Sequence, residues 1–231
     1  MRRKSLYTAI GRFERRTNSH GQACPVILLG GNEYILDLQE MALWTSLSWR
    51  IARKEEIPHL YEKTISKSGF NAERPLEACI HRLLMRGLLV CGTGETDYGA
   101  LYDLLAALYV LPAEGSLLQR ASAFLKFTLL HHAPFSAAGK LFRKDRRTEN
   151  EKQVMGLARQ ALLSTAEIIK CFEKDIRSLS SEESIMDSLY DDDHTTSDNL
   201  PFLACTFPSS RAVILAVANL YLRQQIIFER I

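Results

Sequence analysis

Short runs of apolar residues open the chain, and apolar residues at helical spacing follow them. Two of the short runs flank Gly30-Gly31-Asn32, residues that tolerate the positive φ of a tight turn. The pattern therefore predicts a β-hairpin over residues 26–36. A further apolar run at 88–91, stopped by Gly92, predicts a strand.

Apolar residues at helical spacing, bounded by capping residues, prolines or glycines, predict a series of helices. The first begins after Asp37, which forms the pattern of a capping box with Glu40 three positions later. The predicted helices span residues 38–52, 57–68, 72–86, 98–112, 116–131, 149–179 and 209–231. The sequence therefore predicts a mainly α protein.

The last predicted helix repeats its apolar residues in steps of four and three, as a coiled-coil seam does. The seam consists of Val213, Val217, Leu220, Gln224, Ile227 and Ile231. It is shorter than three heptads, so both an intersubunit contact and packing into the protein's own core remain open.

Charge is unevenly distributed although the net charge is only +2. Residues 1–86 contain fourteen Lys and Arg against nine Asp and Glu, whereas residues 173–198 contain two against nine. The second stretch is rich in Ser, Asp and Glu and lacks periodicity, so we expect a flexible acidic loop over 180–199.

Several classes of protein are not expected from this sequence. No apolar segment follows the basic start, and the longest apolar run, 212–222, is too short for a bilayer, so we expect a cytoplasmic protein without membrane contact. The five cysteines form no C-x-x-C pair, and no nucleophile-elbow, zinc-helix or P-loop motif is present. We therefore expect no enzyme, cofactor or metal site.

The order hairpin, three helices, strand, together with the stretch HRLLMRGLLV at 81–90, resembles a winged-helix domain. The resemblance covers residues 26–91 and implies a transcriptional regulator whose third helix enters the major groove of double-stranded DNA. It implies base or phosphate contacts from the outer face of that helix and phosphate contacts from the basic N-terminal arm. These DNA-binding candidates are Arg74, Glu77, His81, Arg82, Arg86, Arg2, Arg3 and Lys4.

Two observations keep other interpretations open. The charges on the third helix could equally solvate the outer face of a packed helix. Glu95 and Asp97 also stand where a DNA-reading wing would carry Lys or Arg, so we expect no phosphate contact there.

A second resemblance belongs to a different functional class. The hairpin sequence ILLGGNEYILD, a following helix with Trp44, and the GLLV strand are similar to the peptide-binding domains of the pyrroloquinoline-quinone D type. This resemblance implies that an extended peptide adds as a strand to the exposed edge of the hairpin.

The predicted organisation has three parts: a basic arm over 1–25, a winged-helix-like domain over 26–97, and a helical domain over 98–231. The helical domain would serve as a dimerisation or effector region, and a homodimer would form through helices 149–179 and 209–231. Trp44 and Trp49 lie five positions apart. One is therefore expected in the core and the other at an interdomain or partner surface.

Overall fold

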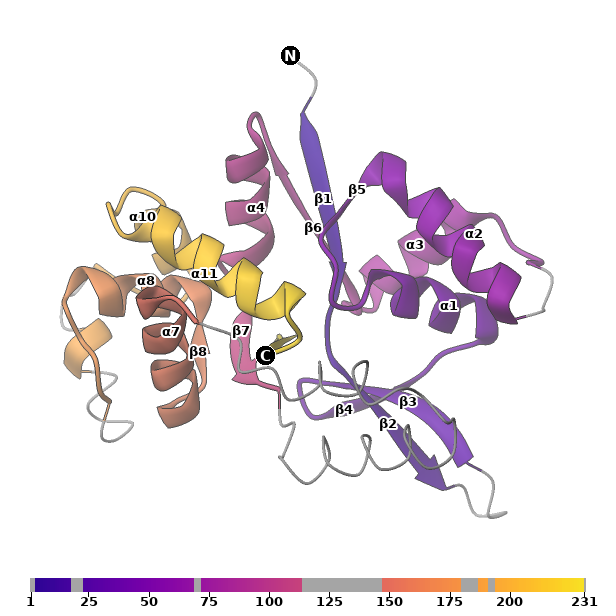
Figure 1. The fold of residues 1–231 in the computed structure, drawn as a ribbon, viewed down its shortest axis with the longest axis horizontal. Helices are drawn as coiled ribbons and strands as arrows, with labels where there is room; N and C mark the ends of the chain where they lie inside the picture. The colour runs from indigo at the N-terminus through magenta and orange to yellow at the C-terminus, as the bar shows by residue number, and fades with distance from the viewer. Residues whose placement is uncertain are drawn as a thin grey trace, which may run out of the picture.

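The computed structural model describes residues 3–17, 23–68, 72–113, 147–179, 187–190 and 194–230. In these ranges the chain forms two groups of helices, each with its own small sheet, and a protruding third sheet (Figure 1). One continuous cluster of buried apolar side chains runs through both groups, from Leu6 to Phe228. None of the described helices is both long and apolar enough to span a bilayer.

The N-terminal group is built around the sheet β5-β1-β6, in which all strand pairs are antiparallel. Its elements are β1 (Lys4–Ala9), α1 (Leu38–Leu47), β5 (Ala52–Arg53), η1 (Lys54–Glu56), α2 (Ile57–Ser68), α3 (Leu76–Met85) and β6 (Leu89–Gly94). A second sheet, β2-β3-β4, is inserted between β1 and α1. It consists of β2 (Arg12–Thr17), β3 (Ala23–Leu29) and β4 (Asn32–Ile35).

The C-terminal group is built around the sheet β8-β7-β9, again antiparallel. Its elements are β7 (Tyr109–Pro112), α7 (Glu149–Gln160), β8 (Leu163–Ser164), α8 (Thr165–Glu173), α10 (Leu200–Ala204), α11 (Ser210–Leu222) and β9 (Ile226–Glu229). Helix α4 (Asp97–Leu105) connects the two groups.

The two groups have the same topology and form an internal repeat. In each, the first strand lies in the middle of its sheet, and a helix, a two-residue edge strand, further helices and the second edge strand follow; the second repeat has the short helix α10 in addition to α8 and α11. We call residues 4–94 the first repeat and residues 109–229 the second repeat. The edge strand β5 corresponds to β8, which lies 111 positions later in the chain. In both repeats the chain between the first strand and the first helix is long, and in the first repeat this insertion forms β2, β3 and β4.

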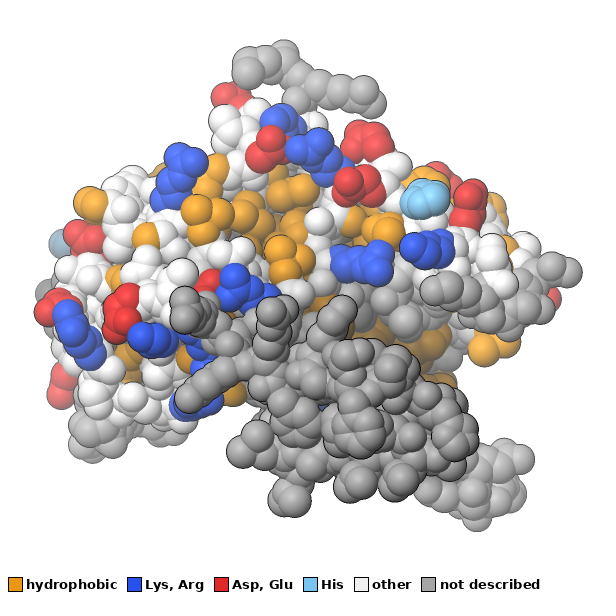
Figure 2. Space-filling view, in the orientation of Figure 1, with side chains coloured by type: hydrophobic (Ala, Val, Ile, Leu, Met, Phe, Trp, Pro, Cys, Tyr) orange, Lys and Arg blue, Asp and Glu red, His pale blue; other side chains and the backbone are white. Residues whose placement is uncertain are grey.

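The repeats are joined through α4, which packs on β6 and β1 and also contacts α11. The hydroxyl of Tyr98 on α4 lies 2.8 Å from Ser210 Oγ at the start of α11. A hollow beside this junction is lined in part by apolar side chains, among them Leu215 and Leu222 of α11. Figure 2 shows apolar side chains gathered at the centre of this face of the molecule.

The expectation of a mainly α protein, with an N-terminal winged-helix domain and an all-α region after residue 98, is wrong. The described residues form three separate sheets, and β8-β7-β9 lies within the region expected to be all helical. The reason is that β7, β8 and β9 are two to four residues long and continue the apolar pattern of neighbouring helices. They become strands only by pairing with one another across the sequence.

Four predicted helices are shorter than expected for this reason. The helix predicted over 38–52 ends at Leu47, before β5. The helix predicted over 149–179 is broken at β8 into α7 and α8. The helix predicted over 209–231 ends at Leu222, so Gln224 of the seam lies in the following turn and Ile227 in β9, while Ile231 lies outside the described residues. The helix predicted over 98–112 ends at Leu105, before β7.

The hairpin, the capping box and the helix at 57–68 are confirmed. Residues 4–9 and 12–17, predicted as part of a basic arm, form strands of two different sheets. The predicted helix 116–131 and half of the acidic loop 180–199 lie outside the described residues.

Candidate functional site

Strand β4 forms an edge of the sheet β2-β3-β4 and pairs, within the described part of the chain, only with β3. The turn before it consists of Gly30 and Gly31, both with positive φ, and joins the paired residues Leu29 and Asn32. In such a two-residue hairpin, alternate residues point their backbone groups away from the partner strand. On β4 these residues are Glu33 and Ile35.

The C-terminal end of α3 lies against this edge. Arg86, which follows the helix, donates a hydrogen bond of 2.8 Å to the carbonyl oxygen of Ile35, and its guanidinium lies 5.6 Å from the ring centre of Tyr34. Arg86 therefore occupies the outward-facing carbonyl oxygen of Ile35 at the end of β4. The backbone groups of Glu33 carry no such contact among the described residues.

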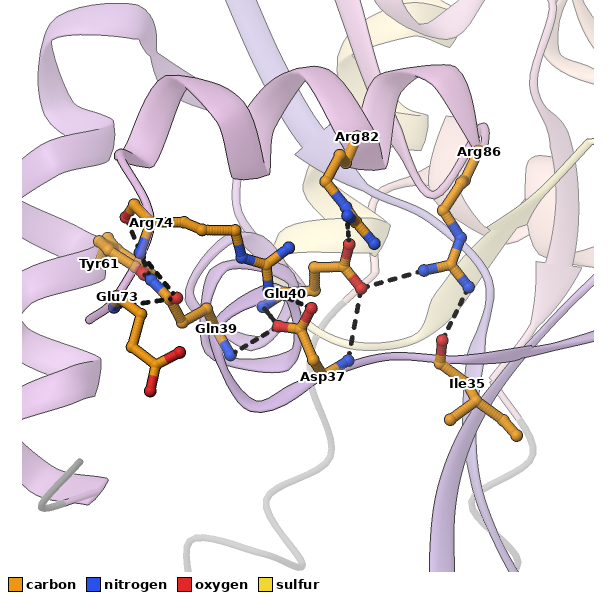
Figure 3. Close-up of polar contacts among 9 residues, drawn as sticks. All are labelled: Ile35, Asp37, Gln39, Glu40, Tyr61, Glu73, Arg74, Arg82 and Arg86. Carbon is orange, nitrogen blue, oxygen red and sulfur yellow. Dashed lines mark hydrogen bonds and ion pairs between the residues drawn. The ribbon is translucent and has the colours of Figure 1, made fainter. Parts of the chain in front are cut away.

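Glu40 is the centre of the polar network between α1 and α3 (Figure 3). Its carboxylate is buried, with 1% of the side chain exposed, and accepts from Arg82 Nε at 2.6 Å and Arg86 Nη1 at 3.0 Å. It also closes the capping box by accepting from the backbone nitrogen of Asp37 at 3.3 Å. One buried carboxylate thus holds two arginines of α3 against the start of α1.

A second set of contacts holds the segment before α3. Gln39 accepts from the backbone nitrogens of Glu73 and Arg74 at 3.1 and 3.0 Å, and donates to the hydroxyl of Tyr61 at 3.1 Å. Arg74 forms an ion pair with Asp37. Burial raises the pKa of Asp37, but the hydrogen bonds from Arg74 and from two backbone nitrogens outweigh this effect and lower the pKa overall. The carboxylate form of Asp37 is therefore favoured.

The predicted DNA-binding residues are divided among different environments. Arg74, Arg82 and Arg86 are brought together, but each points to a carboxylate of the α1 N-terminus. Glu77 and His81 are exposed on the outer face of α3. Lys4 lies on β1 and pairs with Asp97 at 2.7 Å, Arg3 is exposed just before that strand, and Arg2 lies outside the described residues.

The second repeat contains the counterpart of the Glu40–Arg86 pair. Glu151 closes a capping box with Thr148 at the start of α7, and Arg223 after α11 donates to it at 3.2 Å. Arg223 stands 137 positions after Arg86, in the same place relative to helix and strand. Because both repeats contain this pair at the same place relative to helix and strand, we interpret the pair as part of the common scaffold.

The counterpart of Arg82 is Asn219, whose side chain is too short to reach the carboxylate of Glu151 as Arg82 reaches that of Glu40. Glu151 is fully buried, and its Oε1 atom has no hydrogen-bond partner among the described residues. Leaving a buried charged oxygen unpaired is unfavourable.

Asn219→Arg is therefore expected to raise the free energy of unfolding by about 1 kcal/mol, because the new guanidinium would reach Glu151 Oε1 as Arg82 reaches Glu40. Urea denaturation measures the change. Asn219→Lys is the matched control, because it adds the charge without the planar fork of arginine. A loss of stability with arginine would contradict the equivalence of the two positions.

Three exposed apolar side chains flank the network between β4, α1 and α3. Ile35, Leu38 and Met85 are 71%, 70% and 75% exposed, respectively. Leu38 lies two residues before Glu40, Met85 directly precedes Arg86, and the carbonyl of Ile35 accepts from Arg86. Leu38 and Met85 were not among the predicted site residues. Met85 could have been found, because it lies four positions after His81 on the outward face.

The chain matches no known family model, no curated protein and no solved structure. Within the described ranges no group of three His, Cys, Asp or Glu side chains is arranged to hold a metal ion. The geometry of the β4 edge and α3 is therefore the basis for assigning a function.

Proposed function

We propose that this chain is a peptide-binding protein that takes up an extended segment as a fourth strand on β4, beside α3. The observation that carries the proposal is a strand edge that no described residue pairs with and that three exposed apolar side chains border: Ile35, Leu38 and Met85. Backbone hydrogen bonds to such an edge supply affinity, and pockets for alternate side chains supply specificity.

The chemistry of the edge indicates the kind of peptide. Arg82 is 53% exposed although it pairs with Glu40, so its outer nitrogens can donate hydrogen bonds to a further carboxylate. Apolar surface lies on both sides of the arginines. The geometry favours an extended peptide with apolar residues and at least one acidic residue.

DNA binding through α3 stays a prediction. Arg74 and Arg86 are less than one-third exposed and are paired with Asp37 and Glu40, which reduces the positive charge that a phosphate would meet. The contacts of these arginines favour the peptide-binding interpretation.

A proline at the open edge tests the proposal. Peptides selected from a random display library on the full chain are expected to bind the Glu33→Pro variant at least about tenfold more weakly, because proline removes an outward N–H and disturbs the added strand. Fluorescence polarisation with the selected peptides measures the affinity. Met85→Ala is expected to weaken binding as well, without loss of stability, since the side chain is exposed.

The matched control is Arg15→Pro on β2, the other edge strand of the same sheet. Equal effects of both prolines would show that the sheet was disturbed, and unchanged binding in Glu33→Pro would remove β4 as the site. Binding of mixed-sequence duplex DNA that falls steeply with salt and is lost in Arg82→Ala would instead support the regulator.

A further inference from the structure

A cavity of about 590 Å³ lies where the two repeats meet, away from the β4 edge. It is bounded by the turn between β1 and β2, the C-terminal end of α1, and the turn between α11 and β9. The C-terminal ends of α1 and α11 point towards one another at the centre of the molecule (Figure 1). Its size is within the range of pockets that enclose small organic ligands.

Aromatic side chains form most of the apolar wall: Phe13, Trp44, Trp49, Tyr221 and Phe228. The rings of Trp49 and Tyr221 have centroids 5.5 Å apart, and those of Tyr221 and Phe228 4.5 Å apart. As predicted for the two tryptophans, Trp44 is buried and Trp49 packs against the other repeat. Such a wall suits a flat aromatic molecule.

Tyr221 of the second repeat holds the aromatic wall of the cavity in place through hydrogen bonds to the first repeat. Its hydroxyl accepts from Thr8 Oγ1 at 2.7 Å and from the backbone nitrogen of Trp49 at 2.9 Å, and donates to the carbonyl of Ala9 at 2.8 Å. Burial raises the pKa of Tyr221 to about 12, so the phenol stays protonated and keeps its donor. The cavity is therefore held in shape before any ligand enters.

Two residues of the lining have strained backbones. Trp49 and Gln224 have φ of 60° and 58°, and among the described residues Asp175 is the one other non-glycine with positive φ. The first repeat has Gly87, with φ of 70°, at the position of Gln224. The second repeat therefore has the side chain of Gln224 beside the cavity, at a position whose backbone conformation favours glycine. Strained residues of this kind cluster at ligand sites.

The polar groups of the lining include a cation that is available for a ligand. Within the described part of the chain, no ion pair or hydrogen bond engages the guanidinium of Arg50 or the side-chain amide of Gln224. Arg12, by contrast, is paired with Glu14 at 2.6 Å. Arginine binds carboxylates through its planar fork. We infer that the cavity binds a planar aromatic molecule that carries a carboxylate, which Arg50 recognises.

The test uses naphthalene-2-carboxylate and its neutral isostere, naphthalene-2-carboxamide, as probes on the full chain. The chain contains two tryptophans, and both line the cavity, so the two indole N–H resonances report on it directly. The carboxylate is expected to shift both resonances and to bind at least about tenfold more tightly than the carboxamide, as measured by calorimetry.

Variants locate the binding. Arg50→Ala is expected to remove the preference for the carboxylate, and Thr45→Phe, at an exposed position of the lining, to abolish binding of both probes. Arg159→Ala removes an equally exposed arginine from α7 and should change nothing. Unchanged indole resonances at millimolar probe, or equal affinities for the two probes, would overturn the inference. Glu33→Pro should leave probe binding intact, so this inference and the proposed peptide site can fail separately.

Discussion

Replacing Glu40 with alanine is expected to lower the free energy of unfolding by about 3 kcal/mol. The substitution removes a buried carboxylate that accepts hydrogen bonds from two arginines and completes the capping box of α1. Arg82 is half exposed and can return to water, which limits the loss. Arg86 is 28% exposed and, among the described residues, keeps its contacts with Ile35 and Tyr34. Urea denaturation of the full chain measures the change.

Glu151→Ala is the matched comparison, since Glu151 occupies the same place in the second repeat. Its loss should cost less than the loss of Glu40, because one of its oxygens is buried with no hydrogen-bond partner in the described part of the chain, and its removal relieves that desolvation. If both substitutions cost the same, the bond from Arg82 contributes nothing to the stability of the first repeat.

The elements that the sequence predicts well depend on local signals. Gly30 and Gly31 specify their turn through positive φ, and Asp37 and Glu40 cap their helix from within four residues. Pro58 lies in the first turn of its helix, where the missing N–H is tolerated. These features require no knowledge of distant parts of the chain.

The strands of the second repeat depend on distant partners and were missed. Leu163 and Ser164 pair with β7, more than fifty residues earlier, while the apolar positions around them keep helical spacing. A local signal was available, because Ser164 and Glu167 form a capping box that marks a new helix. At Gln224 no local signal exists, since glutamine rarely adopts the left-handed conformation that ends α11.

The repeat and the ion pairs were hidden for related reasons. Few positions are identical between the repeats, among them Glu40 with Glu151 and Arg86 with Arg223, so the sequence shows no clear period. Helical spacing correctly predicts that Arg82 points away from the buried apolar face of α3. It does not reveal that the start of α1 lies opposite, so the arginines of α3 were expected to face solvent or DNA.

Gly92→Ala is expected to lower the free energy of unfolding by at least about 3 kcal/mol through overpacking. A Cβ atom at this position of β6 would lie 2.3 Å from the backbone nitrogen of Leu104 and 2.4 Å from the carbonyl oxygen of Ala100. Both atoms belong to the backbone of α4, so no side-chain rotation can relieve the contact. Helix α4 would have to move away from the sheet as a whole.

That movement would also loosen the junction of the repeats, because α4 holds the second repeat through the hydroxyls of Tyr98 and Tyr102, which contact Ser210 and Pro201. The indole resonance of Trp49, which packs on Tyr221 of the second repeat, should broaden or shift in the variant. Gly156→Ala in α7 is the control, because a Cβ there meets nothing within 4 Å. It should raise stability by about 0.5–1 kcal/mol through the higher helix propensity of alanine. Equal, small effects of the two substitutions would mean that α4 does not pack this closely on β6.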